Sequence, residues 1–224
     1  MPDHHDRPDH ASNQHNHQDE DRYDEEFWED RYRSQDAIWS GRPNHVLVAE
    51  VGDIVPGTAL DVGCGEGGDA IWLAQQGWKV TAVDFSTVAL ERGSARAKEL
   101  GLDGQIQWVH GDLLQWRPGV TYDLVNCQYL HLLRTEQEDD LLPMLAGAVA
   151  PGGTLLYVSH FFEGQIAEER PHLMKRFLST EGIARLLDVD QWEISTASKR
   201  GRPDAGEHPA GHAHDSVLRA HRRN

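Results

Sequence analysis

The sequence predicts an α/β domain built on one doubly wound, mostly parallel β-sheet. Short apolar segments typical of buried strands alternate with segments of helical periodicity between residues 58 and 160. Each helical segment is long enough to serve as the crossover between two parallel strands. A glycine-rich stretch follows the first predicted strand, at the position where such sheets bind nucleotides. These features place a candidate ligand site at the carboxyl edge of the sheet.

Chain length and composition favour a single domain with an unstructured N-terminal tail. The 224 residues suffice for one substantial domain, but not for a cofactor domain plus a separate full-sized catalytic domain. Residues 1–19 are polar and rich in histidine, so we expect a disordered tail there and one folded domain at 20–224. The tail histidines are irregularly spaced, and Cys64 and Cys127 form no C-x-x-C motif, so no metal site or disulfide is expected.

The overall charge points to the kind of partner. The formal net charge is −16, which weighs against nucleic acid because a phosphate backbone requires a basic surface. A small-molecule partner is therefore expected. The longest apolar runs span only a few residues, so the sequence predicts neither a membrane span nor a secretory signal. A cytoplasmic location is the corresponding expectation.

Periodicity, caps and turn residues place the individual elements. Helices are predicted at 20–35, 43–53, 69–77, 86–101, 135–149 and 179–187. Strands are predicted at 58–63, 78–84, 106–112, 122–128 and 154–161. Two late strands, at 191–198 and 215–222, are predicted to form an antiparallel pair at the sheet edge. Ser86 or Thr87 is expected to cap the fourth helix, and Gly101 to end it.

The glycine-rich stretch "ALDVGCGEGGDA" fits two cofactor patterns. Gly63, Gly65 and Gly68 give G-x-G-x-x-G, the dinucleotide fingerprint. Asp61, Gly63, Gly65 and Gly67 give D-x-G-x-G-x-G, the pattern of methyltransferases that use S-adenosylmethionine. In both patterns the glycines let the backbone approach a nucleotide closely. The glycines alone therefore do not decide between the two cofactors.

Acidic residues near the strand ends favour the second pattern. Asp61 would repel a pyrophosphate but attract the cationic end of a cofactor that carries an amino acid. Asp84 ends the second predicted strand, where a carboxylate binds a ribose in either case. Asp112 follows the third strand and offers an acceptor to an adenine amino group. The predicted sheet is followed by a late strand pair and not by a second catalytic domain, which also differs from a typical dehydrogenase.

With these motifs in place, residues 58–160 resemble the class I S-adenosylmethionine-dependent methyltransferases. The resemblance is carried by "LDVGCGEGG", "VTAVDFS", "VHGDLL", "YDLVNCQYLHLL" and "VAPGGTLLYV". The preceding segment, "FWEDRYRSQDAIWSGRPNHVL", is similar to that of the thiopurine, thiol or halide, and tellurite-resistance methyltransferases. The resemblance implies a Rossmann-like fold, S-adenosylmethionine as cofactor and S-adenosylhomocysteine as its product.

The resemblance also implies roles for particular residues. The loop backbone from Gly63 to Gly67 would pack against the methionine part, with Asp61 near its amino group. Asp84 would bind the ribose, Asp112 and Leu113 the adenine, and the segment 126–128 would lie under the reacting sulfur. The residues implied to bind the cofactor are Asp61, Gly63, Cys64, Gly65, Gly67, Asp84, Phe85, Asp112, Leu113, Asn126, Cys127, Gln128 and Trp39. Purely structural alternatives are a loop-orienting Asp61, a turn-capping Asp112 and a core Cys127.

The chemistry of methyl transfer narrows the search for catalytic side chains. Transfer from a sulfonium is an in-line displacement, for which the protein supplies positioning and an apolar pocket. Thiolates, halides and chalcogen anions need no general base, whereas an oxygen or nitrogen nucleophile can require one. His131 lies just past the fourth predicted strand, and His160 lies at the end of the fifth. Both are candidates for the general base, and the alternative for each is a structural or solvent-exposed histidine.

Two rival functions remain at this point. An NAD-dependent oxidoreductase predicts a catalytic tyrosine and lysine pair or a second domain, and the chain contains no Y-x-x-x-K. A methyltransferase-like protein that binds cofactor without turnover is the second rival. Other candidate contributors to the substrate side are Arg42 beside Trp39 and the basic segment "RPHLMKR" at 170–176.

Overall fold

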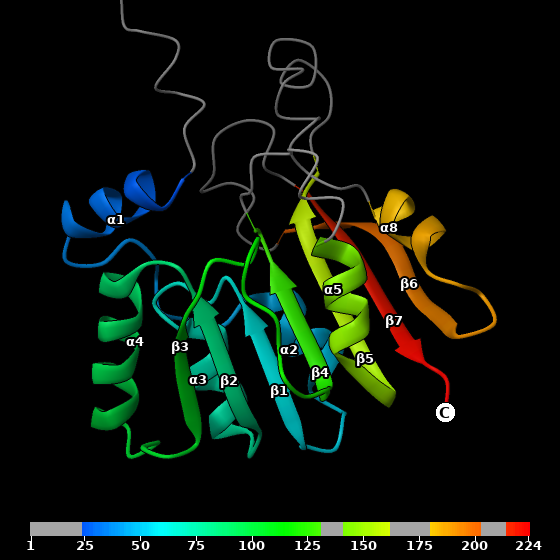
Figure 1. Cartoon of the computed structure of the whole chain (residues 1–224), viewed down its shortest axis with the longest axis horizontal. Helices are drawn as coiled ribbons and strands as arrows, with labels where there is room; N and C mark the ends of the chain where they lie inside the picture. Colours follow the sequence, from blue (N-terminus) through cyan, green and yellow to red (C-terminus); the bar gives the residue numbers. More distant parts are fainter. Residues whose placement is uncertain (1–23, 131–140, 162–179, 203–213) are drawn as a thin grey trace, which may run out of the picture.

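The computed structural model describes residues 24–130, 141–161, 180–202 and 214–224. Its centre is a seven-stranded sheet in the order β3-β2-β1-β4-β5-β7-β6 (Figure 1). The strands are β1 (Thr58–Val62), β2 (Lys79–Asp84), β3 (Ile106–His110), β4 (Tyr122–Gln128), β5 (Val149–His160), β6 (Trp192–Gly201) and β7 (His214–Arg222). The first five strands are parallel, and β7 is antiparallel to both β5 and β6. The predicted doubly wound sheet with a C-terminal antiparallel pair is confirmed.

Helices cover both faces of the sheet. They are α1 (Glu25–Arg33), α2 (His45–Val51), α3 (Gly68–Gln75), α4 (Thr87–Glu99), α5 (Leu141–Ala148) and α8 (Thr180–Leu186). Buried side chains of α2, α3 and α4 share one core with the sheet, and those of α5 and α8 share the other. Figure 1 shows α5 in front of the sheet and α2 and α3 behind it. No helix among the described residues is long and apolar enough to cross a membrane.

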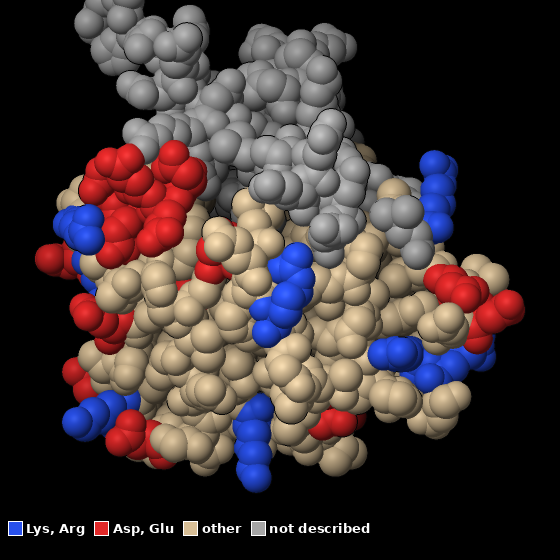
Figure 2. Space-filling model, viewed as in Figure 1, with Lys and Arg blue, Asp and Glu red and all other residues tan. Residues whose placement is uncertain are grey.

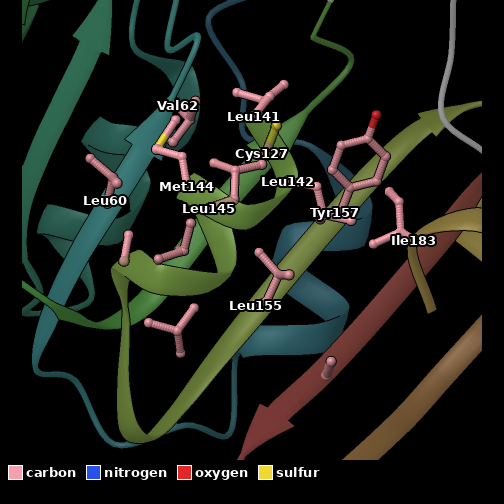
Figure 3. Close-up of a cluster of buried hydrophobic side chains, with 14 of the residues drawn as sticks. Leu60, Val62, Cys127, Leu141, Leu142, Met144, Leu145, Leu155, Tyr157 and Ile183 are labelled. Atoms are coloured by element: carbon pink, nitrogen blue, oxygen red, sulfur yellow. The ribbon is translucent and has the colours of Figure 1, made fainter. Parts of the chain in front are cut away.

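The alternation of side chains along the strands divides the two cores. On β5, Leu155 and Tyr157 belong to the core beneath α5, whereas Leu156 and Val158 belong to the opposite core beneath α2 and α3. Cys127 is fully buried in the α5 core, where Figure 3 shows it among leucine and methionine side chains. Truncating a buried leucine in such a core costs about 2–5 kcal/mol. The central strands are therefore held rigidly beneath the candidate site.

Several predicted boundaries agree with the structure and others differ. Ser86 caps α4 by accepting a hydrogen bond from the Ala89 amide at 3.2 Å, and Gly101 follows the helix with a φ of +71°. The helix predicted at 43–53 begins later, because Asn44 is the N-cap of α2 and Pro43 lies outside it. The fifth strand begins at Val149 rather than at residue 154, because Val149 pairs with Tyr122 across a register shift.

Part of the sequence prediction lies outside the described residues. This holds for the proposed tail at 1–19, for His131, for residues 135–140 of the fifth predicted helix and for the basic segment 170–176. The division into a tail and a domain at 20–224 therefore stays a proposal.

Candidate functional site

The glycine-rich loop lies between β1 and α3, at the carboxyl edge of the sheet. The amides of Gly63 and Cys64 both donate to the Val83 carbonyl, at 2.9 and 3.0 Å. The Gly67 amide donates to the Cys64 carbonyl at 2.9 Å, which closes a tight turn before α3 begins. These bonds tie the loop to the end of β2 at the carboxyl edge of the sheet, where Gly63 and Cys64 are half-buried and the next three residues are buried.

Two of the loop positions require glycine, both because of their backbone conformation and because a side chain would not fit. Gly65 and Gly67 have φ values of +52° and +76°, a region that other residues rarely adopt. A Cβ atom on Gly65 would lie 2.8 Å from the Tyr32 hydroxyl oxygen, and one on Gly67 would collide with the Trp108 ring. The close approach of the tyrosine shows that the N-terminal segment packs directly on this loop.

Asp84 holds the loop from the end of β2. Its side chain is 5% exposed, and its two oxygens accept hydrogen bonds from the Gly65 amide at 2.8 Å and the Ser86 amide at 2.9 Å. Burial raises the pKa of this carboxyl above its usual range, while the two amides oppose that rise. Each carboxylate oxygen can accept a second hydrogen bond. Asp84 can therefore both fix the loop and accept from a ligand hydroxyl.

A buried polar network lies behind the loop. The Asn126 side-chain nitrogen donates to Asp61 Oδ1 at 2.8 Å and lies 3.3 Å from Asp69 Oδ2. Asn44 donates to the Asp69 carboxylate from its backbone amide at 2.7 Å and from its side chain at 2.9 Å. Gln128 donates to the Asn126 oxygen at 2.9 Å. The network joins β1, β4, the first turn of α3 and the cap of α2.

Two acceptors in this network have no hydrogen-bond partner among the described residues. They are Asp61 Oδ2 and Gln128 Oε1, and both atoms are buried. Burial raises the pKa of Asp61 well above its usual range, and the neighbouring Asp69 raises it further, against the opposing hydrogen bond from Asn126. Burial likewise raises the pKa of Asp69. A donor-only, positively charged group would satisfy these acceptors.

The N-terminal segment is attached to the loop through Glu66. This carboxylate accepts from the amides of Ile38 at 3.1 Å and Trp39 at 3.0 Å, and pairs with Arg92 of α4 at 3.0 Å. The Trp39 indole nitrogen donates to the Tyr32 hydroxyl at 3.0 Å, and 47% of the Trp39 side chain stays exposed. The structure thus places Trp39 beside the glycine loop, and its contact with the cofactor stays a prediction.

The predicted adenine side is built from the end of β2 and the turn after β3. Asp112 Oδ1 accepts from the Leu114 amide at 2.9 Å, and Asp112 Oδ2 accepts from the Gln115 side chain at 3.0 Å. These contacts match the turn-capping interpretation of Asp112, and its adenine contact stays a prediction. Leu113 is buried in the α5 core, and Phe85 packs against the cluster that contains Tyr32.

His160 belongs to a second polar cluster, at the carboxyl ends of β4 and β5. Its ring stacks on Tyr129 with 4.8 Å between centroids, and the Arg202 guanidinium lies 5.4 Å above the same tyrosine ring. Asp215 is fully buried and lies 3.4 Å from Arg202 and 3.5 Å from His45. Tyr129 has a φ of +50°, the one positive value at a non-glycine residue in the described part of the chain.

Sequence reasoning missed several members of these clusters. The sequence predicts Asp69 only as part of a helix. Asn44, directly before an apolar helical run, carries a recognisable cap signal. Glu66 and Arg92 were not singled out, and no local pattern pointed to Asp215.

A family comparison agrees with this geometry. Residues 59–153 match the family model described as "Methyltransferase domain". The matched range begins in β1 and ends in β5, so it includes the glycine loop, Asp84 and the Asn126 network. Over these residues the chain is similar to methyltransferases, in agreement with the superfamily that its sequence resembles.

The names of curated relatives point to different acceptors. The chain is 28% identical over 151 residues to a mitochondrial ubiquinone biosynthesis O-methyltransferase of Schizosaccharomyces pombe, covering 61% of this chain and 55% of that protein. It is 33% identical over 108 residues to the ribosomal RNA small subunit methyltransferase C of Alcanivorax borkumensis, covering 47% and 33%. It is 29% identical over 101 residues to a probable thiol methyltransferase 2 of Arabidopsis thaliana, covering 44% and 45%. The chain thus spans about half or less of each of these relatives.

Solved structures share the fold. The N-methyltransferase NodS of Bradyrhizobium japonicum, in complex with S-adenosylhomocysteine, superimposes with a TM-score of 0.69 at 16% identity. The match covers 89% of this chain and 99% of NodS. The chain therefore shares the fold of this structure over most of its length.

Proposed function

We propose, from the methyltransferase domain at residues 59–153, that this chain transfers the methyl group of S-adenosylmethionine to a small-molecule nucleophile. The observation that carries the proposal is the charge around the glycine loop. Asp61, Asp69 and Asp84 are all buried there, and none forms an ion pair with a lysine, arginine or histidine of the described residues. Such a site attracts a cationic cofactor and repels the pyrophosphate of NAD.

The residues present fit this cofactor. The unpartnered Asp61 Oδ2 and Gln128 Oε1 suit its ammonium group, which has only donors. Asp84 can accept from the ribose hydroxyls, and the half-buried backbone of Gly63 and Cys64 is the part of the loop that can meet the methionine part. The remaining predicted contacts are those of Cys64, Phe85, Asp112, Leu113, Asn126, Cys127 and Trp39.

When bound, the cofactor supplies an electrophilic methyl group on a sulfonium. The protein positions that group and keeps water away from it, which accounts for most of the catalysis expected. The positive charge is lost as the sulfonium becomes a neutral thioether, so buried, apolar surroundings favour the transfer. Leu130 lies against Gly63, and the fully buried Cys127 follows Asn126 on β4. These residues supply apolar surface next to the loop.

His160 is the residue proposed to act on the acceptor. It ends β5, at the same sheet edge as the glycine loop, and its stacking on Tyr129 fixes the plane of its ring. An acceptor with an O–H, N–H or S–H group would transfer its proton to His160, whereas an anionic acceptor would need no base. His131 stays a proposal of the same kind from the sequence alone.

The acceptor class follows from charge and from the N-terminal segment. Figure 2 shows acidic side chains gathered over α1, whose sequence "EEFWEDRYR" holds four of them. An acidic rim weakens binding to RNA, because RNA binding depends on neutralising phosphates. The similarity of the segment 27–47 to thiopurine, thiol or halide, and tellurite-resistance enzymes favours thiols, halides and chalcogen anions as the first acceptors to test.

A methyl-transfer assay tests the proposed function. S-adenosylmethionine with a labelled methyl group would be incubated with the full chain and a panel of thiols, halides and chalcogen oxyanions. Ribosomal RNA and ribosomal protein would form separate arms. Label transfer to a small molecule alone supports the proposal. Transfer to RNA or protein alone would contradict the acceptor class, and cofactor binding without transfer to any arm would indicate a non-catalytic binding protein.

A further inference from the structure

Asp61 and Asp69 form a pair of buried carboxylates joined by one amide. Asp61 lies on β1 with 3% of its side chain exposed, and Asp69 lies in the first turn of α3 with 8% exposed. The side-chain nitrogen of Asn126 is 2.8 Å from one carboxylate and 3.3 Å from the other. Two negative charges at this separation, both removed from water, repel one another strongly.

The surroundings of the pair contain no compensating cation among the described residues. The titratable groups that face it are Asp84 from β2, Cys64 from the loop, Cys127 from β4, and Tyr129, which directly follows β4. Each of these groups is acidic. The neutral partners are Asn44, which donates to Asp69, and Asn126. Neutral donors lower the cost of one buried charge but do not balance two.

We propose that Asp61 and Asp69 share one proton in the absence of cofactor and release it to solvent when the cofactor's ammonium group binds beside Asp61. This inference rests on the proposed function and names Asp69, with Asn44 as its anchor, as a positioning residue of that site. A shared proton removes one of the two buried charges while the site is empty. The incoming ammonium group brings the compensating charge, so the proton becomes unnecessary and leaves.

The unpartnered oxygen of Asp61 indicates where the ammonium group binds. Asp61 Oδ1 is held by Asn126, whereas Oδ2 has no partner among the described residues, and neither has Gln128 Oε1. The Asn126 side chain donates to Asp61 through its nitrogen and accepts from Gln128 through its oxygen. It therefore holds the two side chains that carry the unpartnered oxygens. Asp69 accepts three hydrogen bonds from Asn44 and Asn126, so we expect it to act on the ligand through Asp61. Asp61 would therefore contact the ligand, whereas Asp69 would control the protonation of Asp61.

Calorimetric titration of the full chain with S-adenosylhomocysteine tests the proposal. The titration is repeated at one near-neutral pH in buffers of different ionisation enthalpy, and the dependence of the observed heat on the buffer gives the protons exchanged. We expect a release approaching about one proton per ligand bound. Titration with 5′-methylthioadenosine, which shares the nucleoside and thioether but lacks the amino acid, should release none.

Two variants test whether the released proton comes from Asp61 and Asp69. Asp69→Asn keeps the size of the side chain but leaves Asp61 without a charged neighbour, so the release should fall close to zero while binding persists. Asp123→Asn is the matched control, because Asp123 is an exposed carboxylate of β4 that accepts from Thr58 at the opposite edge of the sheet. Its release should equal that of the unmodified chain.

Each outcome bears on a different claim. Binding of S-adenosylhomocysteine without proton release, or equal release by Asp69→Asn, would overturn the shared proton while leaving the proposed function intact. Absence of binding would overturn the proposed function itself. Should Asp69→Asn fail to fold, infrared difference spectra of the unmodified chain decide the question. Ligand binding should abolish the band of a protonated carboxyl group, and an unchanged carboxyl region would contradict the proposal.

Discussion

Glu66 and Arg92 form an ion pair at 3.0 Å that joins the glycine loop to α4. The same glutamate accepts hydrogen bonds from the amides of Ile38 and Trp39, and the same arginine donates to the carbonyls of Tyr32 at 2.8 Å and Gln35 at 2.6 Å. This partly buried pair therefore holds the N-terminal segment against the glycine loop. Losing either partner removes the charged contact of the other.

Glu66→Gln should loosen the N-terminal segment without unfolding the sheet. The amide cannot accept from two backbone amides and balance the Arg92 charge at once, so we expect S-adenosylhomocysteine affinity to fall by about threefold to tenfold. Limited proteolysis should show faster cleavage near α1. Arg33→Ala is the control, because its contacts to Glu29 and Asp30 are exposed and contribute little. Equal affinity and equal protection in Glu66→Gln would contradict the clamping role.

Gly65→Ala and Gly104→Ala separate backbone strain from crowding. Both glycines have a positive φ, of +52° and +81°, so each substitution costs about 1–2 kcal/mol of stability. A Cβ atom on Gly104 meets nothing within 4 Å, whereas one on Gly65 meets the Tyr32 hydroxyl at 2.8 Å. We expect Gly104→Ala to bind cofactor normally and Gly65→Ala to bind more than about tenfold more weakly. Similar affinities for the two variants would show that the close packing at Gly65 is unimportant for binding.

Asp84→Ala should weaken S-adenosylhomocysteine binding by about tenfold or more, because the ribose loses its acceptor and the Gly65 amide loses its anchor. Asp84→Asn should recover part of the affinity, since the amide oxygen can still accept one of the two backbone hydrogen bonds. Circular dichroism and thermal unfolding would establish that both variants remain folded. Unchanged affinity in a folded Asp84→Ala would remove the ribose assignment.

The pH dependence of stability should report the Asp61 and Asp69 pair. Their pKa values are raised in the folded state, so the folded chain holds more protons than the unfolded chain above the unfolded pKa of about 3.9. The contribution of the pair to the free energy of unfolding is therefore full below that pH and falls as the pH rises toward the folded values. The fall should reach up to about 1.4 kcal/mol per pH unit for each proton.

Urea denaturation at a series of pH values measures this effect. The free energy of unfolding of Asp69→Asn should decline less steeply through the window than that of the unmodified chain, because one of the repelling carboxyls is gone. Parallel curves would mean that the two carboxyls do not interact in the folded state.

His160→Asn tests the acceptor side without disturbing the cofactor side. If His160 takes the acceptor proton, the variant should lose about a hundredfold in kcat with protic acceptors and keep its S-adenosylhomocysteine affinity. Its activity with halide or chalcogen anions should be almost unchanged, because these acceptors carry no proton to remove. A uniform loss with both kinds of acceptor would instead indicate that the histidine supports the packing of Tyr129.

The sheet and its loop could be predicted from the sequence because their signals are local. Strand periodicity, the cap at Ser86 and the left-handed Gly101 all depend on neighbouring residues, and each was placed correctly. The D-x-G-x-G-x-G pattern likewise predicts the glycine-rich turn between β1 and α3, and cofactor binding by that turn stays a prediction. Local chemistry of this kind needs no knowledge of the tertiary structure.

The contacts that organise the site could not be predicted, because they join distant parts of the chain. Asn44 meets Asp69 across 25 positions, Arg92 meets Glu66 across 26, and Asn126 meets Asp61 across 65. No periodicity encodes such pairs, so the sequence placed Asp61 beside the loop without its second carboxylate. The position of β7 between β5 and β6 brings Asp215 to Tyr129 and Arg202, and it too depends on the completed sheet.

The most direct test of the central claim is a calorimetric titration of the full chain with S-adenosylhomocysteine, run in parallel with NAD. The buried, uncompensated carboxylates around the glycine loop predict saturable binding of S-adenosylhomocysteine and no heat of binding for NAD. Binding of NAD alone would contradict the account, because a pyrophosphate would then occupy a loop surrounded by Asp61, Asp69 and Asp84.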